Sequence, residues 1–403
     1  MEKEIAFGFG NTVDYEVKWS SKVINSLIEK WNIYKKDIKN VDIKNERDLV
    51  ITILYHMMKE KGGNKDVIEN QLIFDFASHF SKKVTLGGTG VRAAMALDNL
   101  GIPSILHLTT TNEHVRALLP KSCSYYPSAK EDTLYPHLIV QYDINSIVKA
   151  NDIEIHPSRA NRIIYSYDYI SKIMPFSDEF YTKGIESVKV IQEGCFESMV
   201  DQALVKDRMD YLIPILKKAK ERGTIIYGEM GCHHSDITRE VFIKRFVPIE
   251  DILSMNEDEL SDLAQREVNL LDPLDVKNAL LSLRKKLAVP IIVVHSKYWA
   301  IAFGKNAELL KECLESGTAL ATTRFRFGDV YGIKELEDTK NLPKDKKGKR
   351  FCEEICKEFP TDFVCTCSLE TREEDVTTIG LGDTFVAGFV KVLSKIDKEK
   401  LLK

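Results

Sequence analysis

The amino-acid sequence predicts an α/β protein with a mostly parallel sheet and a smaller, β-rich part. First, short apolar segments after residue 185 alternate regularly with helical segments, as they do in βαβ units. Second, residues 134–168 contain two strand patterns with no clear helix between them, which suits a small unit set apart from the core. Third, glycine-rich turns lead into helices at 87–90 and 380–382.

Composition and charge limit the functional classes. The chain has 403 residues, 44% hydrophobic and 29% charged, which is enough for one large globular domain and a smaller one. The formal net charge of -4 gives no support for general nucleic-acid binding. No apolar run approaches the roughly 20 residues that span a bilayer, and the N-terminus lacks the layout of a secretory signal. We therefore expect a cytoplasmic protein without nucleic-acid or membrane partners.

The first part of the chain mixes strands, helices and glycine turns. Ile5 to Phe9 is predicted to be a short buried strand that ends at Gly10. The spacing of apolar residues predicts helices at 20–37 and 46–61. The other elements expected before residue 170 are strands at 83–86, 104–108, 137–142 and 162–167, and a helix that ends at Leu100.

The second part follows the strand–helix order of a parallel sheet. Strands are expected at 188–191, 224–227, 251–253 and 290–294. Helices are expected at 202–221, 236–246, 257–266, 273–286 and 306–316. Residues 334–350 are rich in charge and contain Pro343 and Gly348, so they are predicted to form a solvated loop.

Near the end of the chain, residues 377–388 enter a helix through Gly380 and Gly382, which let the backbone turn tightly and approach a ligand. The unpaired amides of the first helical turn and the helix dipole favour an anion there. Asp383 lies in the same turn and has two possible roles. Its carboxylate could cap the helix. Alternatively, it could accept a proton from a hydroxyl group that attacks a phosphoryl group held by those amides.

The second glycine turn, Gly87-Gly88-Thr89-Gly90, lacks the full pattern of a nucleotide phosphate loop. It is either a tight strand–helix turn or a loop whose backbone lies against a sugar. Arg92 follows the turn, and its planar guanidinium suits a carboxylate or a phosphate. We expect Arg92 either to bind a phosphorylated or acidic sugar or to point to solvent.

The eight cysteines are sparse for a chain of this length, which favours reduced thiols in a cytoplasm. Cys352 and Cys356, followed by Cys365 and Cys367, do not have the usual spacing of a zinc site. Residues 232–234, Cys-His-His, are adjacent and would rarely all face one ion. The sequence therefore favours free thiols over a structural metal.

Both glycine turns resemble those of the ribokinase-like sugar kinases, and further motifs narrow the resemblance to the ADP-dependent glucokinases and phosphofructokinases. These motifs occur in the family's order: Gly10-Asn11-Thr12-Val13-Asp14, Asn161-Arg162-Ile163-Ile164, Asn256-Glu257-Asp258-Glu259 and His295-Ser296. The chain departs from the pattern twice. Arg92 stands where ribokinase-like kinases commonly have Asn, and Tyr227-Gly228-Glu229 stands where the ADP-dependent family has His-x-Glu.

The resemblance implies roles for these residues. The catalytic residues would be Asp383, as the base, with Gly380 and Gly382 in the anion hole. The substrate-binding residues would be Asn11, Asp14, Gly87, Gly88 and Arg92. The nucleotide-binding residues would be Arg162, His295, Thr378 and Leu381. Glu229, Asn256 and Glu259 would hold Mg²⁺, largely through water. Asn256 and Glu259 also fit a helix capping box, and both roles can hold together.

The resemblance also implies the fold and the reaction. The fold would be a ribokinase-like three-layer α/β/α sandwich, with a large domain at 1–14, 76–125 and 175–403 and a lid at 15–75 and 126–174. The reaction would be Mg²⁺-dependent transfer of the β-phosphate of ADP to a hexose or hexose phosphate, with release of AMP, by a monomer or homodimer. The alternatives are an ATP-dependent kinase of another sugar or nucleoside, and a non-catalytic regulator. Intact Asp383 and both glycines argue against the regulator.

Overall fold

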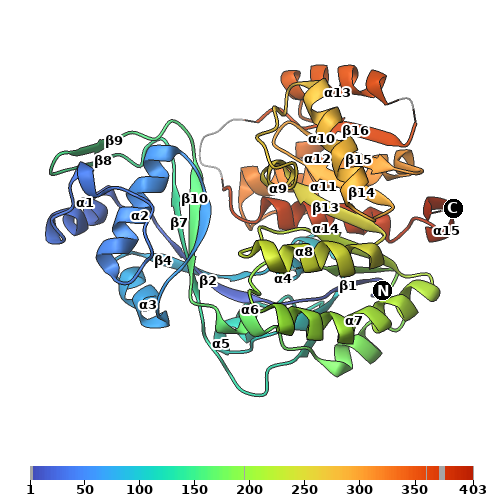
Figure 1. The fold of residues 1–403 in the computed structure, drawn as a ribbon, viewed down its shortest axis with the longest axis horizontal. Helices are drawn as coiled ribbons and strands as arrows, with labels where there is room; N and C mark the ends of the chain where they lie inside the picture. The colour runs from blue at the N-terminus through green and yellow to red at the C-terminus, as the bar shows by residue number, and fades with distance from the viewer. Residues whose placement is uncertain (1–2, 195, 360, 372–376, 403) are drawn as a thin grey trace.

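The computed structural model describes residues 3–194, 196–359, 361–371 and 377–402, which form a large α/β domain and a smaller lid (Figure 1). The large domain is built on a nine-stranded sheet in the order β16-β15-β14-β13-β12-β11-β1-β5-β6. Its strands are β1 (Ile5–Phe7), β5 (Ile105–Leu108), β6 (Ser124–Pro127), β11 (Val190–Glu193), β12 (Ile225–Glu229), β13 (Ile252–Asn256), β14 (Ile291–His295), β15 (Trp299–Gly304) and β16 (Phe363–Cys367).

Most of this sheet is parallel, as the sequence predicts. All neighbouring strands from β6 to β14 are parallel, whereas β15 is antiparallel to both β14 and β16. Parallel strands place their carboxyl ends along one edge, and ligands of open α/β sheets bind beyond that edge.

Helices cover both faces of the sheet, because successive residues of a strand point to opposite sides. On β12, Tyr227 packs against Phe389 on one side, whereas Ile226 joins the core on the other. The first face carries α4 (Thr89–Asp98), α11 (Lys311–Phe327), α12 (Ile333–Lys340) and α14 (Leu381–Leu393). The second face carries α7 (Gln202–Glu221), α8 (Asp236–Arg245), α9 (Glu257–Leu263), α10 (Pro273–Lys286) and α13 (Lys346–Glu358). The predicted three-layer sandwich is confirmed.

The lid is a five-stranded sheet in the order β3-β10-β7-β2-β4. Its strands are β2 (Thr12–Val17), β3 (Gly63–Asp66), β4 (Lys82–Gly87), β7 (His137–Tyr142) and β10 (Asn161–Ser166), and its outer helices are α1 (Ser21–Lys30), α2 (Glu46–Lys59) and α3 (Asn70–Ser78). The short elements are α5 (Glu113–Leu118), α6 (Tyr169–Ile173), α15 (Lys398–Leu402), the hairpin of β8 (Val148–Ala150) and β9 (Ile153–Ile155), and single turns at Lys35–Asp37, Phe180–Gly184, Val247–Ile249 and Ala307–Leu310.

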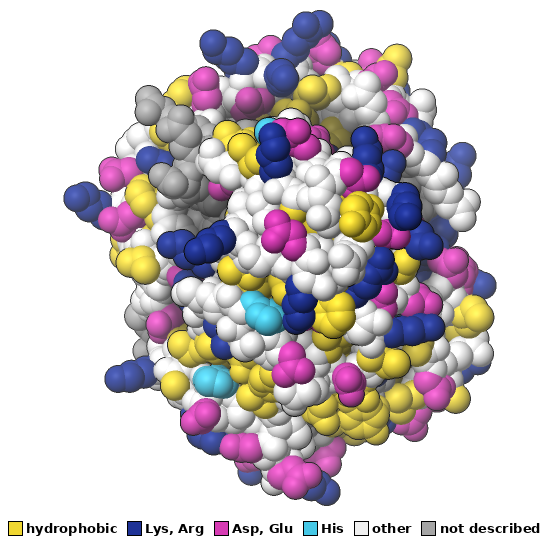
Figure 2. All heavy atoms as spheres, turned by 90° about the vertical axis from the view of Figure 1, so that its left-hand side faces the viewer, with side chains coloured by type: hydrophobic (Ala, Val, Ile, Leu, Met, Phe, Trp, Pro, Cys, Tyr) yellow, Lys and Arg dark blue, Asp and Glu magenta, His cyan; other side chains and the backbone are white. Residues whose placement is uncertain are grey.

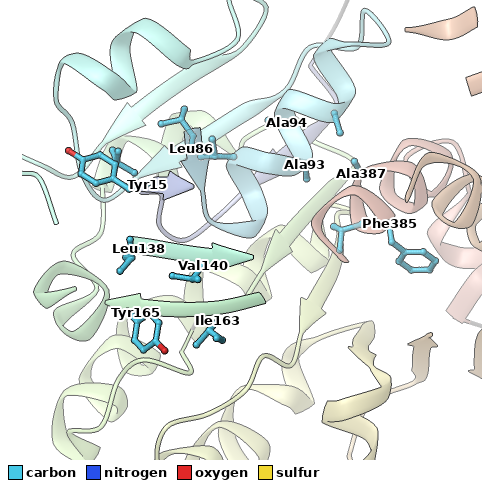
Figure 3. Close-up of a cluster of buried hydrophobic side chains, with 14 of the residues drawn as sticks. Tyr15, Leu86, Ala93, Ala94, Leu138, Val140, Ile163, Tyr165, Phe385 and Ala387 are labelled. Atoms are coloured by element: carbon cyan, nitrogen blue, oxygen red, sulfur yellow. The ribbon is translucent and has the colours of Figure 1, made fainter. Parts of the chain in front are cut away.

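The two faces of the lid sheet differ sharply. Alternate residues such as Tyr15, Val140 and Tyr165 are buried in an apolar cluster (Figure 3). The residues between them share the other face, and most of them are polar: Asp14, Glu16, His137, Gln141 and Arg162, with Ile139 and Ile164 among them. Because strand side chains alternate between faces, this pattern turns one polar face of the lid toward the large domain.

Three sequence-based expectations need correction. Residues 334–350 are not a solvated loop, because α12 and the start of α13 occupy them. The charged residues lie on the solvent side, while Leu336 and Phe351 are buried, and Asp345 caps α13 by accepting a hydrogen bond from the Gly348 amide. The helix expected over 20–37 ends at Lys30. Finally, β4 was expected in the large domain, but it pairs with β2 in the lid sheet.

The surface carries charges of both signs. On the side of the molecule formed by the lid, Lys and Arg side chains are interspersed with Asp and Glu (Figure 2). Such a mixture lacks the single-sign stripe that marks a nucleic-acid footprint. Within the described ranges, no helix combines the length and the apolar composition needed to cross a membrane.

Candidate active site

The predicted site residues converge between the carboxyl edge of the large sheet and the polar face of the lid. The start of α14 is the centre of this region. Gly380 precedes the helix with a φ of 69°, a left-handed conformation that favours glycine. A Cβ atom there would lie 3.1 Å from Arg324 Nε and from Arg92 Nη1. Glycine is therefore required both by the backbone turn and by the two arginines packed against it.

Asp383 lies in the first turn of α14, and its carboxylate is about one-fifth exposed, 22%. Among the described residues, no side chain makes a capping hydrogen bond at this helix end, which contradicts the capping alternative for Asp383. Its Oδ2 atom lies 3.8 Å from Arg92 Nε. Next to it, Gly382 faces His295, whose Cε1 would lie 3.6 Å from an added Cβ atom. The structure thus leaves the Asp383 carboxylate available at the helix N-terminus.

Arg92 does not point to solvent, because its side chain is only 6% exposed. Its Nη2 atom donates to Asp14 Oδ2 at 2.6 Å and to Glu16 Oε1 at 3.2 Å. Burial alone would lower the pKa of Arg92, but the carboxylates of Asp14, Asp383 and Glu16 raise it overall. Arg92 is therefore an internal cation that joins a lid strand to the start of α14. Its expected contact with a substrate phosphate stays a prediction.

Asp14 and the Gly87 turn fit together closely. Thr12 Oγ1 donates to Asp14 Oδ1 at 2.8 Å, and a Cβ atom on Gly87 would lie 2.4 Å from that same carboxylate oxygen. Gly88 has a φ of 91°, and its added Cβ atom would lie 2.4 Å from the Gly10 carbonyl oxygen. Both glycines are therefore needed for the close approach of the two loops.

Asn11 has a structural role in this fold. Its side chain is 2% exposed, and its Oδ1 atom accepts hydrogen bonds from the amides of Thr109 and Thr110 at 3.0 and 3.2 Å. These bonds join the loop after β1 to the loop after β5. A direct contact between Asn11 and a substrate stays a prediction.

Asn256 and Glu259 form the capping box that the sequence predicts at the start of α9. Asn256 Oδ1 accepts from the Glu259 amide at 2.9 Å, and Glu259 Oε2 accepts from the Asn256 amide at 2.9 Å. Glu229 lies beside Ser254 on the neighbouring strand. The capping role is confirmed, and the metal role stays a prediction.

The carboxylates around this box repel one another. Burial, followed by the charges of Asp383 and Glu259, raises the pKa of Glu229 well above its usual range. Burial and the Glu197 carboxylate raise the pKa of Glu259 to about 7. The Oε2 atom of Glu229 is buried and has no hydrogen-bond partner in the described part of the chain. A cation at this position would reduce the repulsion between the carboxylates of Glu229 and Glu259 and would give the Oε2 atom of Glu229 a partner.

Tyr227 is the residue that stands where the resemblance described above implies a His. It is fully buried, and its ring packs 5.3 Å from that of Phe389. Burial, followed by the charge of Glu229, raises the pKa of its hydroxyl well above 10, so the group stays neutral. Tyr227 therefore contributes packing and a neutral hydroxyl group at this position.

The predicted nucleotide residues flank α14. His295 ends β14 and lies 4.5 Å from the Phe385 ring, and burial lowers its pKa to about 4, so it is neutral near pH 7. Leu381 is the first residue of α14. Thr378 donates through its amide and hydroxyl to Gln141 Oε1 of the lid at 3.4 and 3.3 Å. The loop before α14 is thereby joined to the lid sheet.

Arg162 extends from β10 on the polar face of the lid. Burial lowers its pKa, while the Asp383 carboxylate has the opposite effect. In the described ranges, its guanidinium has neither a hydrogen bond nor an ion pair. Arg162 is therefore a cation directed at the site with its donors still available.

Three residues of the site were missed from sequence. His137 lies opposite Asp14 in the lid sheet, and its Nε2 atom is 3.0 Å from Asp168 Oδ2. Burial opposes its charge, but the Asp168 carboxylate raises its pKa overall. Gln141 shares this face, and the two polar residues at 137 and 141, an even number of positions apart in an otherwise apolar strand, were an available signal for both. Arg324 donates to the Ile379 carbonyl oxygen at 2.7 Å, and nothing in its helical sequence context indicated this.

Comparisons with known proteins agree with this architecture. The family model described as "ADP-specific Phosphofructokinase/Glucokinase conserved region" matches residues 3–390. The ADP-specific phosphofructokinase of Thermococcus kodakarensis is 24% identical to this chain, and the match covers 97% of the chain and 96% of that protein. The ADP-specific phosphofructokinase of Thermococcus litoralis is 31% identical, over 47% of this chain and 45% of its own length.

Solved structures share the fold at low sequence identity. A hypothetical ADP-dependent phosphofructokinase from Pyrococcus horikoshii OT3 has a TM-score of 0.77 and 19% identity, and the match covers 99% of this chain and 98% of that one. An ADP-dependent kinase in complex with fructose-6-phosphate and ADPbetaS has a TM-score of 0.74 and 16% identity, with coverage of 98% and 95%.

Proposed function

Because the chain belongs to the ADP-specific phosphofructokinase/glucokinase family, we propose that it transfers the β-phosphate of ADP to a hydroxyl group of a hexose phosphate and releases AMP. The observation that carries this proposal is the partly exposed carboxylate of Asp383 at the N-terminus of α14, beside Gly380 and Gly382. Fructose 6-phosphate is the preferred acceptor in this proposal, because the curated relatives are phosphofructokinases. Glucose is the alternative acceptor.

Asp383 acts as the general base. Its carboxylate accepts the proton of the attacking hydroxyl group, a contribution that is typically worth about 10²–10⁴ in rate. The amides of the first turn of α14 and the dipole of that helix stabilise the negative charge on the transferring group. Asp14, which is 3% exposed and held by Thr12, positions the sugar together with the Gly87 turn.

Phosphoryl transfer depends on alignment and on neutralised charge more than on covalent chemistry by the protein. Arg162 supplies a cation from the lid. Carboxylate oxygens suit Mg²⁺, and the buried, unpartnered oxygen of Glu229 beside Glu259 fits such an ion. Glu229 and Glu259 would hold it, largely through water. When bound, the ion would neutralise charge on the phosphates of the nucleotide.

The lid excludes water from the reaction. Its polar face lies against the site, and the Thr378–Gln141 contact joins the loop before α14 to this face. A closed lid prevents water from replacing the sugar as acceptor. We propose that Thr378, Leu381 and His295 border the nucleotide on the large-domain side.

A matrix of two donors and two acceptors tests the function. Turnover is measured with ADP and ATP, each with glucose and fructose 6-phosphate, in the presence of Mg²⁺ and after chelation with EDTA. We expect the highest kcat/KM with ADP and fructose 6-phosphate, and loss of activity with EDTA that added Mg²⁺ restores. Turnover with ATP well above that with ADP would contradict the donor assignment, and absence of turnover in every cell would favour a non-catalytic regulator.

A further inference from the structure

Four cysteine side chains gather where α13 packs on β16, outside the candidate active site. Cys352 and Cys356 are one helical turn apart on α13, and Cys365 and Cys367 alternate on β16. Residues four apart on a helix share a face, and so do residues two apart on a strand. Helix and strand therefore present their thiols to the same contact.

The closest pair is Cys352 and Cys365, whose Sγ atoms lie 2.7 Å apart. A displacement of well under 1 Å would bring them to the S–S bond length of about 2.05 Å. Both residues are partly exposed. Cys367 is buried and its thiol also interacts with that of Cys352. We propose that Cys352 and Cys365 are an oxidation site that forms a reversible disulfide between α13 and β16.

A metal site explains the cluster less well. In the described part of the chain, no group of three or more His, Cys, Asp or Glu side chains is arranged to hold a metal ion. The thiols are also neutral in the reduced state, because their mutual hydrogen bond and burial raise the pKa of Cys352. Metal ligands are thiolates, so the arrangement favours a protonated dithiol.

The proposed step is an exchange with a low-molecular-weight disulfide such as oxidised glutathione. Two protein thiols lose two protons and two electrons, and one S–S bond forms between Cys352 and Cys365. The S–S bond of the reagent breaks, and it leaves as two thiol molecules. A reducing dithiol reverses the reaction. Attack requires a thiolate, so the raised pKa of Cys352 makes the reaction slow at neutral pH.

The disulfide would restrain a region next to the candidate nucleotide residues. Ser368, directly after β16, donates through its amide to the Tyr298 carbonyl oxygen at 2.9 Å. Gly348 of α13 packs against the same oxygen, since an added Cβ atom would lie 2.1 Å from it. Tyr298 is thus held by both elements that the disulfide would join. The crosslink restricts the unfolded chain, so we expect oxidation to raise the Tm.

The test uses the full-length protein and does not depend on its enzymatic activity. Free thiols are counted in the folded and unfolded protein after treatment with oxidised glutathione, and the product is mapped by proteolysis and mass spectrometry without reduction. We expect a loss of two thiols per chain, a Cys352–Cys365 crosslinked peptide, a higher Tm, and recovery of both thiols with dithiothreitol.

Two substitutions provide the controls. Cys352→Ser should abolish both the crosslink and the rise in Tm. Cys356→Ser, one turn away on the same helix, should retain both. The proposal is overturned by an unchanged thiol count in the oxidised wild-type protein, by a crosslink that maps to another pair, or by stoichiometric zinc in the reduced protein. These outcomes concern the wild-type protein, so they decide the question even where a variant fails to fold.

Discussion

Arg92 and Arg162 approach the same carboxylate, Asp383, from opposite domains, yet their environments differ. Arg92 comes from α4 of the large domain and is bound by the carboxylates of Asp14 and Glu16. Arg162 comes from the lid and has no partner among the described side chains. The charge of Arg92 is neutralised by carboxylates of the protein, whereas we propose that the charge of Arg162 is neutralised by a ligand. Residue type alone therefore does not tell a structural cation from a ligand-binding one.

The largest expected effect is on stability, from Arg92→Ala. Removing one partner of a buried ion pair leaves the others uncompensated, which typically costs about 3–5 kcal/mol. We expect a drop of this size in the free energy of unfolding, measured by urea denaturation. Arg162→Ala is the matched control and should leave it nearly unchanged.

A loss of substrate binding without a loss of stability in Arg92→Ala would instead support Arg92 as a ligand-binding residue. If its main partner is a substrate phosphate, Arg92→Ala should weaken fructose 6-phosphate binding by about 1.5–3 kcal/mol, the range of a charged hydrogen bond. Glucose binding and stability would then change little. Calorimetric titration with both sugars separates these cases.

The next effect concerns the carboxylate that both arginines approach. Asp383→Asn keeps the size of the side chain but cannot accept a proton. We expect kcat to fall by at least about 10², with little change in Tm or in nucleotide affinity. Steady-state kinetics and thermal unfolding are the measurements. An Asp383→Asn variant that retains most of its kcat would remove Asp383 as the base.

A smaller effect is expected for Arg162→Gln, which keeps some hydrogen-bonding ability but removes the charge. ADP affinity should weaken by about 1.5–3 kcal/mol, while the KM for the sugar changes little. Arg159→Gln is a suitable control, because Arg159 is an exposed lid arginine that donates to the Glu60 carbonyl oxygen instead. Equal losses of ADP affinity in the two variants would show that Arg162 has no specific role.

The smallest effect tests a third arginine. Arg324 is buried and paired with Asp329, and although burial raises the pKa of Asp329, Arg324 and Lys83 lower it overall to about 2. A carboxyl group whose pKa is lowered by folding stabilises the fold at every pH above the pKa that it has in the unfolded chain. This stabilisation is lost as the pH falls through the lower pKa of the folded state. Asp329→Asn should therefore cost about 1 kcal/mol at pH 7 and clearly less at pH 2, where about half of the Asp329 carboxyl groups are protonated. A constant difference in unfolding free energy across this range would reject the linkage.

Much of the fold follows from local patterns. The strand–helix alternation after residue 185 predicts the parallel sheet, because β12, β13 and β14 are nearly continuous apolar runs separated by helices. The prediction of a solvated loop at residues 334–350 was wrong for the opposite reason. Their charge dominates the composition, whereas the helices depend on a few buried residues, Leu336 and Phe351, and on the cap at Asp345. The mean polarity of a segment does not reveal where its few apolar residues and its capping residue lie.

The candidate site was predictable only in part. The glycine turns and Asp383 carry a spacing that is visible in sequence, and the structure places them together. The partners of Arg92 depend on the register of β2 against β4 and on the position of α4, which are tertiary facts. His137 is similar, because its proximity to Asp14 depends on the pairing of β7 with β2.

The ion pairs of Arg92 would also constrain a rotation of the lid against the large domain. Arg92 belongs to the large domain and forms ion pairs with Asp14 and Glu16 of β2, so a rotation of the lid would have its axis near this strand. The sheet order places β7, β10 and β3 progressively farther from β2. If the lid rotates about an axis near β2, Arg162 on β10 is displaced farther than Asp14. We therefore expect Asp14 to stay beside Arg92 in an open form of the lid, and Arg162 to approach the proposed phosphate site only as the lid closes.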